Sequence, residues 1–146
     1  MLFRSLRTAV SKEDICHREA DFDVLLKSIE QKILSLFQIE KRNQYNAVVI
    51  TGSGTAANEA MLSSVVGHGH ILILSNGEFG DRLYNISKIH NTNTHLFEIP
   101  WGQMFDLQYI EAYLRMNNID VIAMVHHETC SGMLNPLAQI GSLAKS

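Results

Sequence analysis

The stretch VVITGSGTAANEA, residues 48–60, says more about the fold than any other part of the chain. Its β-branched start is typical of a buried strand, and its Gly-Ser-Gly-Thr segment followed by alanines is typical of a tight turn that opens a helix. Such a turn points free backbone N–H groups and the positive end of a helix dipole at one place. The stretch therefore predicts a strand, a turn and a helix that bind a phosphate group.

Composition and charge fit one soluble α/β domain. The 146 residues are 46% hydrophobic and 18% charged, which is ordinary for a globular protein. A formal net charge of -3 argues against a nucleic-acid partner. The apolar runs are too short to span a bilayer, and residues 1–14 lack the apolar core of a secretory signal. We therefore expect a cytoplasmic protein that binds neither nucleic acid nor membrane.

Hydrophobic periodicity predicts helices that alternate with short strands. Apolar residues spaced by 3.6 positions predict amphipathic or partly buried helices at Phe22–Phe37, Thr55–Val66, Phe79–His90 and Leu107–Asn117, the last with Asp106 as its N-cap. Short apolar runs predict strands at Ala47–Ile50, Ile71–Leu74, His95–Ile99 and Val121–Val125. The alternation predicts an α/β fold of three layers, with a mostly parallel sheet and helices on both of its faces.

The loops that follow the strands carry the candidate site. Ligands of parallel sheets collect at the carboxyl ends of the strands, so the residues directly after each apolar run have the greatest functional weight. Three such loops contain glycine or polar residues, namely Gly52–Thr55, Asn76–Gly80 and His126–Gly132. We expect them to converge on one pocket.

The first loop leaves two other interpretations open. It matches the dinucleotide fingerprint G-x-G-x-x-A, but the second predicted strand does not end in the acidic residue that this site requires, and Glu78 is the nearest acid. The structural alternative is a glycine turn that only lets a strand meet a helix. The hydroxyls of Ser53 and Thr55 favour a phosphate, because a phosphate accepts several hydrogen bonds at a helix start.

The third loop contains His126, His127 and Glu128, which are residue types found in zinc sites. Neighbouring residues of a strand point to opposite faces, so the two histidines do not readily share one ion and no metal site is predicted. The alternative is one histidine in the core and the other near a pocket. Cys130 has no base motif nearby and is interpreted as a loop residue, not a nucleophile.

Four separated motifs follow one another along the chain: Cys16-His17-Arg18-Glu19 with Phe22, Gly52–Ala57 with Glu59-Ala60, Asn76–Gly80 with Arg82, and His126–Gly132 with Asn135-Pro136-Leu137. Together they resemble the class V aminotransferases, pyridoxal-phosphate (PLP) enzymes with the aspartate-aminotransferase fold. The resemblance covers nearly the whole chain from about Arg7 onward. Within the class it is strongest to 2-aminoethylphosphonate:pyruvate transaminases, with alanine or serine:glyoxylate aminotransferases as near relatives.

The resemblance implies a role for each matching residue. Ser53, Gly54 and Thr55 match the turn that holds the PLP phosphate. Phe79 matches the aromatic residue that stacks on the pyridine ring, and we expect the glycines on either side of it to clear space for that ring. Thr129 matches the hydroxyl residue that makes a hydrogen bond near the 3′-oxygen of the cofactor.

The resemblance also implies what lies outside the chain. In the family, the aspartate that pairs with the pyridine nitrogen and the lysine that forms a Schiff base with PLP come later, beyond Ser146. We therefore expect residues 1–20 to be an N-terminal segment and residues 21–146 to be part of a PLP-binding large domain, incomplete at the C-terminus. Later strands of the family flank Ala47–Ile50 and Val121–Val125, so we expect the first to lack a ladder partner here and the second to form a bare sheet edge.

The expected function is that of the N-terminal part of an aminotransferase. The whole relative would move an amino group from 2-aminoethylphosphonate or a small amino acid to pyruvate or glyoxylate, and it would be a homodimer. The chain alone is expected to be inactive, since none of its lysines follows a strand end. The alternative is a truncated, non-catalytic remnant that binds only a phosphate or a partner subunit.

Overall fold

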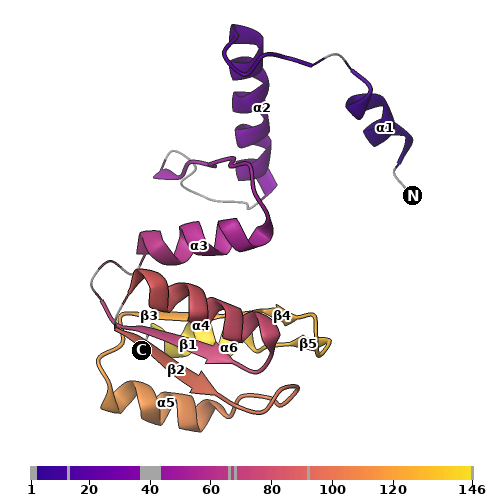
Figure 1. The fold of residues 1–146 in the computed structure, drawn as a ribbon. Helices are drawn as coiled ribbons and strands as arrows, with labels where there is room; N and C mark the ends of the chain where they lie inside the picture. The colour runs from indigo at the N-terminus through magenta and orange to yellow at the C-terminus, as the bar shows by residue number, and fades with distance from the viewer. Residues whose placement is uncertain are drawn as a thin grey trace. The chain divides into compact units, whose positions relative to one another are not determined.

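The computed structural model describes residues 3–12, 14–36, 44–65, 67, 69–91 and 93–145, and it divides into two compact units, Met1–Thr51 and Gly52–Ser146 (Figure 1). Unit 1 contains the helices α1 (Arg4–Val10) and α2 (Ala20–Leu36), neither of which has a buried residue. Helix α2 confirms the predicted amphipathic helix, whose last residue lies outside the described residues, and α1 was not predicted. In the part of the chain that the structure describes, no helix combines the length and apolar character needed to cross a bilayer.

Unit 2 is built on a parallel sheet of three strands. They are β1 (Ile71–Ser75), β2 (Thr94–Glu98) and β3 (Val121–Met124), in the order β2-β1-β3. Ile71 at the start of β1 lies opposite the first residue of each neighbouring strand. The three strands confirm the predicted runs to within one residue. Among the described strands β3 pairs only with β1, so its other edge is bare, as predicted.

Four helices belong to unit 2: α3 (Gly54–Val65), α4 (Glu78–His90), α5 (Leu107–Met116) and α6 (Leu137–Leu143). The first three confirm predicted helices with ends shifted by one residue. The predicted N-cap of α5 is also confirmed, because the Asp106 carboxylate accepts a hydrogen bond from the backbone N–H of Gln108 at 2.9 Å.

Helices cover both faces of the sheet, and β1 lies between the two layers (Figure 1). Ile71 and Ile73 of β1 pack with α3 and α4, whereas Leu72 and Leu74 pack with α5 and α6. The four side chains are at most 1% exposed. Full burial of an aliphatic side chain of this size stabilises a fold by about 1.5–3 kcal/mol. The predicted three-layer α/β fold is confirmed.

The predicted strand at Ala47–Ile50 does not form. These residues belong to no strand, and the side chains of Val48, Val49 and Ile50 are 80%, 49% and 50% exposed. A strand is stable only when a neighbour satisfies its backbone hydrogen bonds, and among the described strands β1, β2 and β3 pair only with one another. The predicted strand is therefore wrong.

Gly80 allows α4 to pack closely on the end of β1, which yields a first prediction. A Cβ atom at Gly80 would lie 2.5 Å from Ser75 Oγ and 2.8 Å from Ser75 Cα. Rotation of a side chain cannot relieve a clash with the backbone of the central strand. We expect Gly80→Ala to lower the free energy of unfolding by about 1–3 kcal/mol, the usual cost of overpacking, in urea denaturation.

The matched control is Gly141→Ala in α6, where a Cβ would meet nothing within 4 Å. Alanine has the higher helix propensity, so we expect this variant to be unchanged or more stable by up to about 1 kcal/mol. Equal losses of stability in the two variants would contradict the packing explanation.

Candidate functional site

The second and third predicted loops meet at the carboxyl end of β1. Helix α4 begins just after β1 ends, and β4 (His127–Glu128) and β5 (Met133–Leu134) form a short antiparallel hairpin after β3. This hairpin was not predicted. Figure 1 shows that α3 and α4 both begin at this end of unit 2, where the hairpin also lies.

Asn76 and Asn135 join the end of β1 to the hairpin. The amide of Asn76 donates to Asn135 Oδ1 at 2.8 Å, and the amide of Asn135 donates back to Asn76 Oδ1 at 3.0 Å. Each amide nitrogen also donates to a backbone carbonyl, that of Gln103 for Asn76 and that of Val125 for Asn135. The two residues are 1% and 3% exposed, so the pair is a buried polar contact with its donors satisfied.

Glu128 joins the hairpin to the beginning of α4. The residue is 0% exposed, and its Oε2 accepts hydrogen bonds from the backbone N–H groups of Phe79 at 3.1 Å and Gly80 at 3.2 Å. A helix leaves its first N–H groups without partners inside the helix, so an acceptor from elsewhere in the chain stabilises its start. The other oxygen, Oε1, is buried and has no hydrogen-bond partner among the described residues.

Gly77 permits the close approach of Glu128, and Gly80 permits the close approach of α4 to the end of β1. A Cβ atom at Gly77 would lie 2.5 Å from Glu128 Cδ, and one at Gly80 would overlap Ser75. The prediction that these glycines clear space for a cofactor ring is therefore wrong. The space beside Gly77 is filled by the Glu128 side chain, and the space beside Gly80 is filled by the end of β1.

Phe79 is half-buried at the start of α4, and Arg82 covers one side of its ring. The guanidinium carbon lies 4.9 Å from the ring centroid, within the range of a cation–π contact. Arg82 also pairs with Glu78 at 3.1 Å, but both side chains are more than a third exposed, so the ion pair itself adds little stability. The positive charge of Arg82 therefore lies against one face of the Phe79 ring.

The other predicted site residues lie at the start of α3 and in the turn after β4. Ser53 and Gly54 are exposed and Thr55 is half-buried. The Ser53 carbonyl accepts from the Ala57 N–H at 3.3 Å, which puts Ser53 at the N-cap position. Thr129 is exposed, directly after Glu128. Hydrogen bonds join the second and third loops, but no hydrogen bond between described residues joins the first loop to them. That the three loops share one pocket stays a prediction.

The histidines of the third loop do not enter the core. His126 and His127 are both exposed, so the interpretation that one of them is a core residue is wrong. In β4 the inward position is taken by Glu128, because the N–H groups of α4 provide hydrogen bonds for its carboxyl group there. Within the described ranges no three His, Cys, Asp or Glu residues are grouped as a metal site requires. Cys130 is a free, exposed cysteine.

Glu128 and Asn135 are the residues of this region whose contacts were not predicted. A polar residue has no hydrophobic pattern to mark it as buried, and β4 and β5 are only two residues long. The usable signal was the pair of glycines around Phe79, since a glycine beside a helix start can mark a close approach by another segment.

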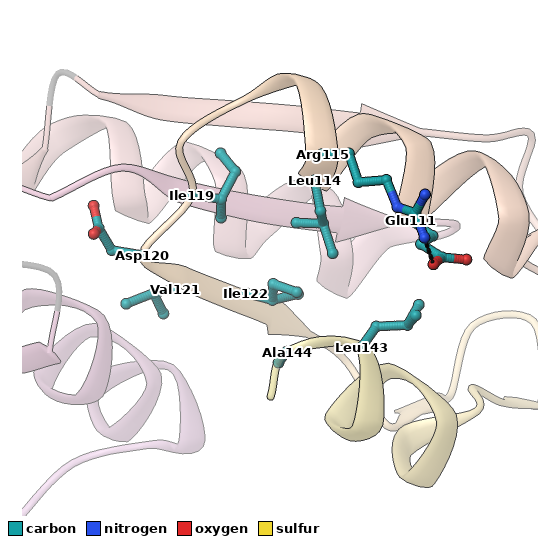
Figure 2. A pocket seen from close by; sticks show the side chains of 9 residues that line it. All are labelled: Glu111, Leu114, Arg115, Ile119, Asp120, Val121, Ile122, Leu143 and Ala144. Carbon is teal, nitrogen blue, oxygen red and sulfur yellow. Dashed lines mark hydrogen bonds and ion pairs between the residues drawn. The ribbon is translucent and has the colours of Figure 1, made fainter. Parts of the chain in front are cut away.

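A cavity of about 430 Å³ lies apart from these loops, between β3, α5 and α6 (Figure 2). The Glu111–Arg115 ion pair, with a nitrogen–oxygen distance of 2.6 Å, forms part of its wall. None of the predicted site residues lines it, so it is not assigned to the candidate site. Its lining residues are Glu111, Leu114, Arg115, Ile119, Asp120, Val121, Ile122, Leu143 and Ala144.

Curated proteins similar in sequence are aminotransferases of greater length. A 2-aminoethylphosphonate–pyruvate transaminase of Phocaeicola vulgatus is 36% identical over 143 residues, which are 97% of this chain and 39% of that protein. One of Klebsiella pneumoniae is 36% identical over 135 residues, which are 90% of this chain and 36% of that protein. The chain therefore spans less than half the length of these relatives.

Solved structures of aminotransferases share the fold. An alanine–glyoxylate aminotransferase from Nostoc sp. superposes on 98% of this chain and 37% of its own, with a TM-score of 0.82 and 27% identity. A pyridoxamine–pyruvate aminotransferase from Mesorhizobium loti gives a TM-score of 0.86 at 21% identity, over 98% of this chain and 36% of its own. At that identity the likeness shows the fold alone.

The family model for aminotransferase class V matches residues 2–146. Its match includes all three loops at the end of unit 2, and the fold agrees with that of the solved aminotransferases. The chain belongs to the class V aminotransferases, whose cofactor is PLP.

Proposed function

We propose that this chain is the N-terminal part of a PLP-dependent aminotransferase and that it holds the phosphate and one face of the cofactor ring. In this proposal the whole protein is a cytoplasmic homodimer. It transfers an amino group from 2-aminoethylphosphonate to pyruvate. Two relatives that carry this activity in their names are each 36% identical to the chain and support this choice of substrates.

The observation that carries the proposal is the difference between the two helices that begin at this end of unit 2. At α4 the Glu128 carboxyl group already accepts the N–H hydrogen bonds that a phosphate would need. At α3 the first turn contains no acidic residue, and Ser53 and Gly54 are exposed. A phosphate binds best where several N–H and O–H donors are free, so α3 is the suitable helix.

The chemistry of the remaining residues fits the rest of the cofactor. In the proposed site Ser53, Gly54 and Thr55 bind the phosphate, and Phe79 offers a flat apolar face to the pyridine ring. The Thr129 hydroxyl donates a hydrogen bond near the 3′-oxygen. PLP, when bound, supplies the electron sink for amino transfer, whereas these residues bind and orient it.

A second candidate is a non-catalytic chain that binds a phosphate or a partner subunit. It is favoured by the fact that none of the three loops contains a lysine. Determining the coding sequence downstream of codon 146 separates the candidates, because the enzyme requires an in-frame lysine after a later strand. The protein of the complete reading frame is then assayed for alanine formed from 2-aminoethylphosphonate and pyruvate. Alanine or serine with glyoxylate is the second substrate pair in this assay, because it tests the lesser alternative of an alanine or serine:glyoxylate aminotransferase.

The proposed phosphate contact yields a second prediction. Replacing Thr55 with Val removes one O–H donor while it keeps the size of the side chain. A hydrogen bond to a charged group contributes about 1.5–3 kcal/mol, so we expect the Kd of PLP to rise about tenfold to a hundredfold. Fluorescence titration of the complete protein measures the Kd.

Pyridoxal, which lacks the phosphate, should bind wild type and Thr55→Val with equal affinity. The control variant is Ser63→Ala on the same helix, where the hydroxyl is exposed and donates to the Glu59 carbonyl at 2.8 Å. An unchanged Kd of PLP in Thr55→Val would contradict the phosphate contact and leave Thr55 as a helix-start residue.

A third prediction concerns covalent capture of PLP. We expect residues 1–146 alone to form no stoichiometric bond with PLP at any one lysine, because an amine must be held at the reacting carbon to bond efficiently. Borohydride reduction followed by peptide mass spectrometry measures this, with the denatured chain as the background. A stoichiometric pyridoxyl adduct on a single lysine of the folded chain would refute the expectation.

A further inference from the structure

Glu128 lies between two of the proposed cofactor contacts. Its side chain accepts hydrogen bonds from the backbone of Phe79 and Gly80, and the next residue in the chain is Thr129. Phe79 and Thr129 come from segments fifty residues apart. The hydrogen bonds of Glu128 join these two segments, because their donors are the N–H groups of Phe79 and of the next residue, Gly80.

This arrangement is costly, because a carboxyl group is fully buried and its Oε1 finds no partner among the described residues. It also excludes any side chain at position 77, since a Cβ there would lie 2.5 Å from Glu128 Cδ. An apolar side chain would fill the same space without an orphaned oxygen. Packing alone therefore does not explain why a carboxyl group is buried at position 128 despite its cost in free energy.

We infer that Glu128 is a positioning residue for the cofactor site, an inference that rests on the proposed function. Its Oε2 fixes the backbone of Phe79 relative to the turn that carries Thr129. The ring contact and the 3′-oxygen contact are thereby held as one rigid unit, independently of the phosphate contact at α3. Glu128 itself touches neither the cofactor nor the substrate.

The experiment compares Glu128→Ala with wild type in the complete protein. We expect the Kd of PLP to rise about tenfold, because the hydrogen bonds that orient Phe79 relative to Thr129 are lost. We also expect the induced circular dichroism of bound PLP to disappear. The affinity for inorganic phosphate should not change, because α3 keeps its donors. Without any ligand, the amides of Phe79 and Gly80 should lose their protection from hydrogen exchange.

Two further variants separate positioning from general stability. Glu128→Gln keeps an oxygen that accepts the same two N–H hydrogen bonds, so we expect it to restore the dichroism and the amide protection. It also carries the test if Glu128→Ala does not fold. Asp106→Ala removes a carboxylate cap from another helix, α5, where the carboxylate accepts from Gln108 at 2.9 Å. It should lower the stability of the protein, as the loss of an N-cap does, yet leave PLP binding unchanged.

Three results would overturn the inference. The first is unchanged PLP dichroism in Glu128→Ala. The second is a loss of affinity for inorganic phosphate in Glu128→Ala that equals its loss of affinity for PLP. The third is PLP binding in Glu128→Gln or Asp106→Ala that is as impaired as in Glu128→Ala. A wild-type protein that binds no PLP would contradict the proposed function instead. In that case the exchange of the Phe79 and Gly80 amides still decides whether Glu128 holds the start of α4, because that measurement needs no ligand.

Discussion

Burial of β1 on both faces is the constraint on which the rest of unit 2 depends. A strand covered by helices on either side has no access to water, so the polar groups that follow it must find partners within the protein. Ser75 and Asn76, the residues at the end of β1, are 0% and 1% exposed. Ser75 Oγ donates to Asp81 Oδ1 at 2.5 Å, and Asn76 exchanges hydrogen bonds with Asn135. The candidate site lies where these buried, hydrogen-bonded polar residues follow the end of β1.

The same constraint explains why the two helices at this end differ. Helix α4 starts directly after the buried strand, and the hydrogen bonds from the N–H groups of Phe79 and Gly80 are partly buried and buried, so these groups need an acceptor from the protein. Glu128 supplies it. Helix α3 begins in an exposed turn, where water or an anion can satisfy the same kind of donor. The exposed start of α3 is therefore the one that we propose as the phosphate site.

The sequence predicted those parts of the fold that repeat over many residues. Helices α3 to α5 and the three parallel strands are marked by apolar spacing, because each buries one face or both. Helix α2 is marked by the same spacing, although it has no buried residue in this structure. The strand at Ala47–Ile50 was predicted wrongly for the same reason: its apolar run shows a capacity for strand structure, but pairing depends on a neighbour that a local pattern cannot reveal. The β4–β5 hairpin and the burial of Glu128 left no periodic signal, since each depends on contacts between distant segments. The roles of Ser53, Gly54, Thr55, Phe79 and Thr129 remain predictions.

The contact between Gly77 and Glu128 also restricts how this sequence can change over evolutionary time. A side chain at position 77 is incompatible with the glutamate, because the two would occupy the same space. A shorter residue at position 128 removes that conflict, so the two positions are epistatic. A lineage that lost the glutamate first would be free to accept alanine at position 77, and the glutamate could not return afterwards until the glycine was restored. The two positions thus act as a ratchet, in which the order of substitutions decides whether the change is reversible.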